Sequence, residues 1–131
     1  MVIKIWGSRG SIPVCGQEYV RYGGDTTCIE IRTKNGRVII VDAGTGIRRL
    51  GKALLAEGLT DCDLIFTHAH WDHVIGFPFF RPLYSGKTRL RIHGCPFAED
   101  FVRAMLGRMM SPPNFPVNYG DLKARIQYSE G

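Results

Sequence analysis

The sequence lacks any apolar run near the roughly 20 residues that a membrane-spanning helix needs, which excludes that class of protein. Its first residues also lack the hydrophobic stretch and cleavage site of a signal peptide. Four cysteines are present, and no two of them form a C-x-x-C pair. We therefore interpret them as reduced, buried thiols of a cytoplasmic protein. They are Cys15, Cys28, Cys62 and Cys95.

Dense basic runs with interleaved aromatic residues are also missing, so RNA binding is permitted but not indicated. The net charge of +5 is modestly basic and would favour an anionic substrate such as a phosphate ester. Arg48, Arg49 and Lys52 are interpreted as the solvated polar face of a helix. The length of 131 residues fits one domain, at 1–131, and no repeat, low-complexity tract or linker divides it.

The first half of the sequence alternates between strand-like runs and turns. A strand is expected at 2–6, followed by a glycine-rich loop at 7–24 and a second strand at 27–33. Asn35-Gly36 then favours a hairpin with a type I′ turn. The next strand, 37–42, is nearly all apolar, which is typical of a strand buried on both faces.

A helix should begin with Thr45 as its cap and end near Glu57, because Gly58 suits the residue that stops a helix. Its apolar stripe comprises Ile47, Leu50, Ala53 and Leu54. A strand at 64–67 and a short helical stretch through Phe80 should follow.

Another strand is expected at 89–93, and Pro96 suits the first turn of a second helix. Pro112-Pro113 would end that helix, and 123–128 form a late strand. Four large apolar residues recur every four positions on this helix and are interpreted as its core face rather than a binding stripe. They are Phe97, Phe101, Met105 and Met109.

Three of the four histidines stand within six positions, in His68-Ala69-His70-Trp71-Asp72-His73. Side chains two apart on an extended segment point the same way, so His68 and His70 can converge on one ion. Asp72 continues that parity, whereas Trp71 should turn away into packing. His73 can converge only if the chain turns at Asp72, and it would then serve a second ion.

Imidazole suits zinc, iron and manganese, and a carboxylate shifts such a site toward hydrolytic metals. Two ions about 3.5–4 Å apart would activate a bridging water and stabilise the leaving oxygen. Asp72, which could bind the second ion and orient that water, is the candidate catalytic residue. The alternative is a loop of ordinary hydrogen-bonded histidines, which the clustering of three makes much the weaker interpretation.

The pattern His68-x-His70-x-Asp72-His73 resembles the signature of the metallo-β-lactamase superfamily. Val38 to Gly46 resembles the strand and Asp-containing turn that precede the signature there. Three further segments resemble one branch, which includes ribonuclease Z-like and phosphonate-pathway phosphodiesterase-like hydrolases. These segments are Trp6 to Pro13, Tyr22 to Cys28 and Gly76 to Phe80, with Asp25 standing where many relatives have Asn.

The resemblance implies an α/β fold, the αββα sandwich, with a mixed sheet and flanking helices. Roughly the first βα half is present, because the sequence stops at Gly131, before the motifs that supply the remaining metal ligands in the family. We therefore expect a domain truncated at its C-terminus, with the inner face of its sheet apolar and exposed. Such a face should drive self-association.

The resemblance also implies a role for Asp42, which would brace the metal loop rather than bind metal. A turn-capping aspartate is the alternative. The fourth histidine, His93, matches no ligand of the family and is interpreted as structural. Ser8, Arg9 and Ser11 could line a phosphate pocket, with a plain connecting loop as the alternative.

These observations favour a hydrolase that uses two divalent ions to cleave a small phosphodiester or another anionic substrate. Zinc is the first choice of metal, with manganese and iron as alternatives. The main alternative is a truncated, non-catalytic fragment that binds metal weakly and self-associates. A metal-binding regulatory or redox module without a substrate pocket is a third hypothesis.

Overall fold

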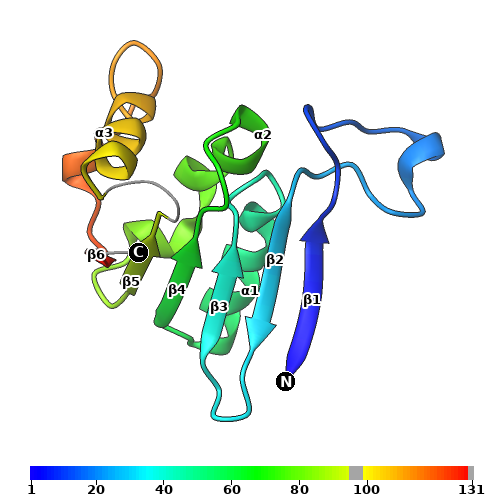
Figure 1. Ribbon diagram of the computed structural model, residues 1–131, viewed down its shortest axis with the longest axis horizontal. Helices are drawn as coiled ribbons and strands as arrows, with labels where there is room; N and C mark the ends of the chain where they lie inside the picture. The colour runs from blue at the N-terminus through cyan, green and yellow to red at the C-terminus, as the bar shows by residue number, and fades with distance from the viewer. Residues whose placement is uncertain (95–98, 130–131) are drawn as a thin grey trace.

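The structure is a computed structural model, and it describes residues 1–94 and 99–129. Six strands form one mixed sheet in sequential order, as Figure 1 shows. The first three strands pair antiparallel, and the third to the sixth pair parallel. The strands are β1 (Val2–Gly7), β2 (Cys28–Arg32), β3 (Val38–Val41), β4 (Asp61–Ile65), β5 (Arg89–His93) and β6 (Arg125–Ser129). The α/β class and the presence of six strands are confirmed, but β4 lies earlier than the predicted 64–67 and β6 begins later than the predicted 123.

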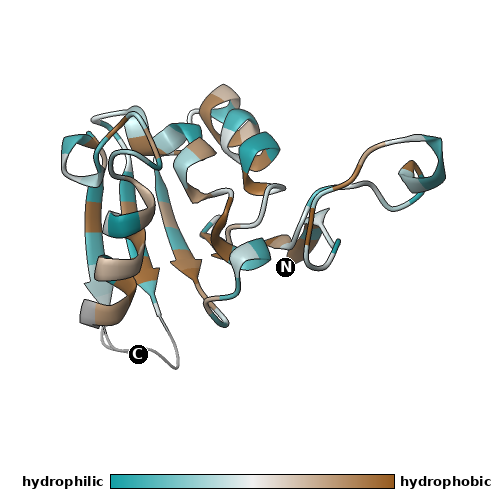
Figure 2. Ribbon diagram, turned by 90° about the horizontal axis from the view of Figure 1, so that it is seen from above, coloured by the Kyte–Doolittle hydropathy of each residue, from teal (hydrophilic) through white to brown (hydrophobic). Residues whose placement is uncertain are grey.

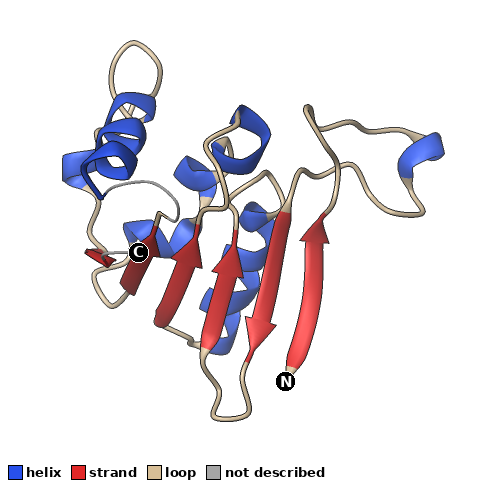
Figure 3. Ribbon diagram, viewed as in Figure 1, coloured by secondary structure: helices blue, strands red, loops and turns tan. Residues whose placement is uncertain are grey.

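Among the described residues, three α-helices and four short 3-10 helices connect the strands, and Figure 3 shows α1 lying behind the sheet. In the part of the chain that is described, no helix is long and apolar enough to cross a membrane. The α-helices are α1 (Ile47–Glu57), α2 (Trp71–Val74) and α3 (Glu99–Met109). The 3-10 helices are η1 (Gln17–Tyr19), η2 (Phe77–Phe79), η3 (Arg81–Tyr84) and η4 (Tyr119–Asp121).

One hydrophobic core holds the described elements together. The inward residues of the central strands, such as Ile40 and Leu64, are fully buried against Leu50 and Leu54 of α1. Gly58 takes a left-handed conformation after the last turn of α1 and donates to carbonyls of that turn, as expected of a helix stop. The α1 helix thus makes the crossover between the parallel strands β3 and β4.

The opposite face of β1–β4 carries no helix among the described residues, and Figure 1 shows these strands unobstructed from the front. Except for Asp63, which pairs with Ile39, the cross-strand partners on this face are branched aliphatic residues. Ile3 and Ile5 on the edge strand are 60% and 63% exposed. We call these residues the open face: Ile3, Ile5, Ile29, Ile31, Ile39, Val41 and Ile65.

The strand β3 corrects two predictions. Ile39 and Val41 are only half-buried, so β3 is covered on one face and not on both. Its hairpin to β2 does not have a type I′ turn, because Gly36 has a positive φ of 82° and Asn35 does not. A hydrogen bond from Gly36 N to Thr33 O instead closes a three-residue loop that ends in a left-handed glycine.

Thr45 does not cap α1, because the helix begins after Gly46 without a side-chain cap. The Thr45 hydroxyl instead accepts a hydrogen bond from Thr26 N at 2.8 Å and donates to Asp25 Oδ1 at 3.0 Å. It therefore ties the glycine-rich loop to the start of α1. The helical stretch predicted through Phe80 is broken into α2 and the 3-10 turn η2.

The predicted core stripe of α3 is correct in part: Met105 and Met109 are half-buried and pack against the core, whereas Phe101 is exposed. The fully buried residues stand one position further along, at Val102, Leu106 and Met110. Phe97 lies outside the described residues. A spacing of four residues fits either stripe, so periodicity alone does not choose between them. Of the thiols, Cys28 and Cys62 are buried as predicted, Cys15 is exposed, and Cys95 lies outside the described residues.

On the same face of the sheet, next to the open face, a polar cluster surrounds the buried carboxylate of Asp63. Arg37 Nη2 donates to it at 2.7 Å, Arg91 Nε at 2.9 Å, and His93 Nε2 lies 3.1 Å away. His93 Nδ1 also contacts the Ser129 hydroxyl. His93 is therefore fully engaged in hydrogen bonds, which agrees with its interpretation as a structural residue.

Burial alone would raise the pKa of Asp63, but hydrogen bonds from Arg91 and His93 and the charges of both arginines outweigh it and lower that pKa. A carboxyl whose pKa is lower in the folded than in the unfolded state stabilises the fold above its ordinary pKa of about 4. That stabilisation is lost as the pH falls through the folded pKa.

The buried and exposed leucines of α1 provide a matched stability test. Leu54→Ala should lower the free energy of unfolding by about 2–5 kcal/mol, because Leu54 is fully buried in the core. Leu55→Ala, the same substitution on the exposed neighbour, should cost less than about 1 kcal/mol. Urea denaturation of both variants measures the difference, and equal losses would contradict this placement of α1.

The charge on Asp63 should show in the pH dependence of stability. Between pH 6 and pH 3, the unmodified protein should lose unfolding free energy more steeply than Asp63→Asn, which has no proton to bind at that position. Asp121→Asn, which changes an exposed aspartate, should follow the unmodified protein. Parallel slopes for all three proteins in chemical denaturation would contradict the assigned role of the cluster.

Candidate metal centre

The histidine-rich segment follows β4 and meets the turn that follows β3, at the carboxyl ends of adjacent parallel strands. Backbone hydrogen bonds lock the two together: Ala43 N donates to His73 O, and Gly76 N donates to Ala43 O, both at 2.8 Å. A Cβ at Gly76 would lie 2.0 Å from the carbonyl oxygen of Gly44, so only glycine permits this approach. The backbone therefore fixes where α2 sits.

Asp42 is the central side chain of this arrangement. It is buried, and its backbone takes a positive φ of 64°, a conformation that non-glycine residues rarely adopt and that clusters at functional sites. Its Oδ1 accepts from Thr67 N at 2.9 Å. Its Oδ2 accepts from the Thr67 hydroxyl at 2.7 Å and lies 2.8 Å from His73 Nδ1.

These contacts orient two imidazoles. A carboxylate oxygen only accepts, so His73 Nδ1 donates to Asp42, and Nε2 is the ring nitrogen that this bond leaves available. The Thr67 hydroxyl gives its one proton to Asp42, so at 2.9 Å it accepts from His68 Nδ1. Nε2 is then also the nitrogen of His68 that remains available to a metal ion.

The three imidazoles lie against one another. The ring centroid of His68 is 4.5 Å from that of His70 and 4.0 Å from that of His73. His73 Nε2 lies 3.5 Å from Asp72 Oδ2. His73 was expected to reach the cluster only if the chain turned at Asp72. The chain does turn there, because α2 begins at Trp71. The segment thus brings together all four predicted ligands.

The glycine-rich loop binds the side chain of Asp72. Ser11 N donates to Asp72 Oδ2 at 2.9 Å, and this backbone hydrogen bond, with the neighbouring His73, holds the pKa of Asp72 below its usual range. Asp72 is therefore ionised at neutral pH and available as a charged ligand. Ser11 itself has a positive φ of 68°.

Within the residues described, no three His, Cys, Asp or Glu side chains converge closely enough to hold an ion as they stand. The donor set nevertheless fits a divalent metal. Three imidazoles and an ionised carboxylate lie in one cluster, and two of the imidazoles have Nδ1 engaged in a hydrogen bond and Nε2 available to an ion. Hydrogen bonds that orient a ligating histidine in this way are typical of metal sites.

The predicted substrate residues are only partly brought to this centre. Ser11 reaches Asp72 through its backbone, as described. The Arg9 guanidinium lies over the ring of Tyr19 at 4.7 Å, and the side chain of Ser8 is exposed. Figures 1 and 2 both show the segment with η1 standing out beside β1, with a largely hydrophilic tip in Figure 2.

Two residues next to the ligands depart from expectation. Trp71 does not turn into the core and is 60% exposed. Thr67 was not identified from the sequence, although it connects Asp42 to His68. Its position directly before the first histidine, at the end of a strand, was the only available signal.

Comparison with known proteins identifies the family of this chain. The sequence profile described as "Metallo-beta-lactamase superfamily" matches residues 21–124. Ribonuclease Z of Pyrococcus abyssi (strain GE5 / Orsay) is 28% identical over 100 residues, covering 72% of this chain and 33% of that protein. Ribonuclease Z of Bradyrhizobium sp. (strain ORS 278) is 35% identical over 88 residues, covering 63% and 28%.

Two solved structures share the fold. A diphosphatase from the PhnP family superimposes with a TM-score of 0.62 at 17% identity, covering 98% of this chain and 50% of that one. The metallo-beta-lactamase fold protein YhfI from Bacillus subtilis gives 0.60 at 17% identity, covering 98% and 45%. The chain thus spans about a third of the length of these curated relatives and half or less of these structures. By its profile, its relatives and its fold, the chain belongs to the metallo-beta-lactamase superfamily.

Proposed function

We propose that this chain is a metal-dependent hydrolase that cleaves phosphodiester bonds. The observation that carries the proposal is the hydrogen-bonded path from Asp42 through Thr67 to His68, and directly to His73. This path engages the Nδ1 atom of both imidazoles and leaves Nε2 as the nitrogen available to an ion, which is the hydrogen-bonding pattern typical of histidines that bind a metal.

His68, His70, Asp72 and His73 would hold two divalent ions, with zinc as the first choice and manganese or iron as alternatives. When bound, such ions lower the pKa of a coordinated water toward about 7 and neutralise charge in the transition state. The expected ligands are imidazole nitrogens and a carboxylate, which matches hydrolytic zinc sites.

Asp72 is the residue to which we assign a direct part in the reaction. The Ser11 amide donates to its Oδ2 and holds the carboxylate in place, where it would bind an ion and accept a hydrogen bond from the attacking water. Because its pKa is lowered, Asp72 is ionised and suits an orienting acceptor rather than a general acid at neutral pH.

The substrate class rests on relatives and on charge. Two relatives are named ribonuclease Z and one structural neighbour is named a diphosphatase, so phosphorus-oxygen bonds recur among them. The net charge of +5 favours an anionic substrate, either a small phosphodiester or RNA. The free thiols of Cys15, Cys28 and Cys62 fit a reducing compartment, and we extend the proposal to a cytoplasmic protein.

A second candidate function is a non-catalytic fragment that binds metal weakly and associates with itself. The open face favours it, because seven branched aliphatic residues form one surface that no described helix covers. A contiguous apolar surface of this kind marks an interaction site. Association and hydrolysis are compatible, since the open face and the histidines use different residues.

Removal of one proposed ligand tests the hydrolase proposal. With zinc added, the unmodified protein should hydrolyse bis(p-nitrophenyl) phosphate, and His70→Ala should lower turnover at least about 100-fold, since even outer hydrogen-bond partners contribute 10–100-fold. His93→Gln, which changes the histidine outside the cluster, should keep the activity. Turnover that His70→Ala leaves unchanged would rule out this mechanism.

Sedimentation velocity tests the self-association proposal. At micromolar concentration the unmodified protein should sediment as more than a monomer, and Ile5→Lys should shift it toward monomer by placing a charge on the open face. Ile12→Lys is the matched control, because Ile12 is exposed to the same degree, 62%, but lies outside that face. A stable monomer for the unmodified protein would count against self-association.

A further inference from the structure

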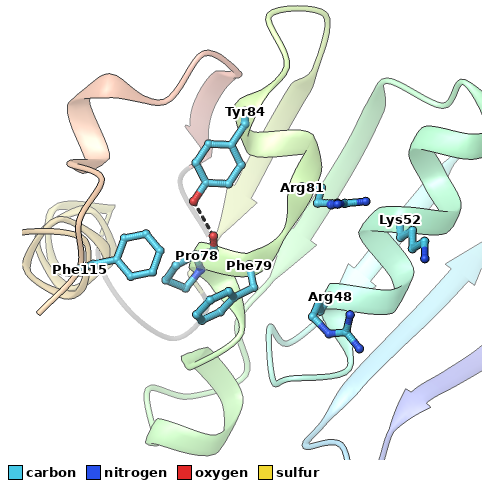
Figure 4. A pocket seen from close by; sticks show the side chains of 7 residues that line it. All are labelled: Arg48, Lys52, Pro78, Phe79, Arg81, Tyr84 and Phe115. Carbon is cyan, nitrogen blue, oxygen red and sulfur yellow. Dashed lines mark hydrogen bonds between the residues drawn. The ribbon is translucent and has the colours of Figure 1, made fainter.

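A hollow of about 450 Å³ lies between α1, the two 3-10 turns after α2, and the segment after α3. Figure 4 shows its two sides: Arg48, Lys52 and Arg81 lie on one, and the rings of Phe79, Tyr84 and Phe115 lie with Pro78 on the other. These residues come from three segments that are distant in sequence: α1, residues 78–84, and the segment after α3. The hollow is separate from the histidine cluster, which supplies none of its lining.

The cations of this hollow are unpaired. Within residues 1–94 and 99–129, none of Arg48, Lys52 and Arg81 has an ion-pair partner. Arg49, the next residue on α1, pairs with Asp25 at 3.0 Å. Arg48 and Lys52 are like charges one helical turn apart, an arrangement that destabilises a helix unless an anion offsets it. The hollow is therefore suited to negative charge.

The aromatic side of the hollow presents exposed ring surfaces. Phe79 is 52% exposed, and Phe115 meets it edge-on at 5.6 Å between ring centroids. The Tyr84 hydroxyl donates to Pro78 O at 2.5 Å, which holds that ring in place. Such rings are costly to leave in water and offer stacking surfaces to a planar ligand.

The hollow continues toward the metal centre. A second cavity of about 430 Å³ shares Pro78, Phe79 and Phe115 with the first and reaches Trp71. Trp71 is exposed and stands between His70 and Asp72 in the chain. The two cavities therefore adjoin at these shared residues, with the three cations lining the first and Trp71 lining the second, and together we call them the groove.

We propose that this groove binds single-stranded nucleic acid, with phosphates against Arg48, Lys52 and Arg81 and bases stacked on Phe79, Phe115 and Trp71. Unpaired cations combined with exposed aromatic faces are the features by which proteins hold single strands. An acidic peptide would use the cations but not the rings. A free nucleotide would fill the first cavity and leave the second, with Trp71, unused.

Binding by this groove is independent of hydrolysis, because its residues are not the proposed metal ligands. It can therefore be measured in EDTA and in His70→Ala. Should hydrolysis fail while binding persists, only the proposed function is wrong. Should binding fail while hydrolysis persists, only the groove assignment is wrong.

The probe is a fluorescein-labelled ten-nucleotide adenosine RNA, followed by fluorescence anisotropy in EDTA between 50 and 200 mM salt. The triple variant Arg48→Gln, Lys52→Gln, Arg81→Gln should weaken binding and reduce the slope of log K against log salt by about 2, since each phosphate contact contributes about 0.7. The matched control replaces Lys34, Lys87 and Lys123 by Gln, three exposed lysines outside the groove, and should keep most of the affinity.

Phe79→Leu tests the stacking surface while keeping an apolar side chain, and it should weaken binding roughly tenfold. Equal losses for the two triple variants would overturn the proposal, because they would show attraction by net charge alone. Unchanged binding by Phe79→Leu would also overturn it. Displacement of the RNA by adenosine monophosphate at equal nucleotide concentration would overturn it as well. That result would show that linking the nucleotides into a strand adds nothing to the affinity.

Discussion

The candidate site depends on one carboxylate, that of Asp42. It accepts hydrogen bonds from Thr67 and His73, and through Thr67 it orients His68. A single buried group thereby fixes the orientation of two imidazoles and the position of the segment that carries all four proposed ligands. The backbone at Asp42 is held at a positive φ, a conformation that persists only where the surrounding contacts over-determine it.

The sheet supplies the rest of the geometry. The strands β3 and β4 run parallel and side by side, so the turns at their carboxyl ends meet, and this edge of a parallel sheet is where ligands bind in open α/β folds. The two faces of the sheet differ. One packs on α1 and forms the core, and the other exposes aliphatic residues over β1–β4 and a network around Asp63.

Local sequence patterns predicted most of the strands, α1 and the histidine cluster. The features that the sequence did not predict depend on contacts between segments that are distant in the chain. The parity of His68, His70 and Asp72 identified the cluster, and Gly58 correctly ended α1. Trp71 was misplaced because parity gives the side on which a residue points but not what lies there. The sequence showed no basic run with aromatic residues, and the fold assembles such a surface from α1, η2, η3 and the segment after α3.

The central claim is that the segment after β4 gathers around bound cations under the control of Asp42. A crystal grown with zinc, with an anomalous difference map collected at the zinc edge, tests it most directly. The account predicts a peak among the imidazoles of His68, His70 and His73 and the carboxylate of Asp72, with Asp42 still bonded to His73. A map without a peak there, in crystals that bind zinc elsewhere, would contradict it.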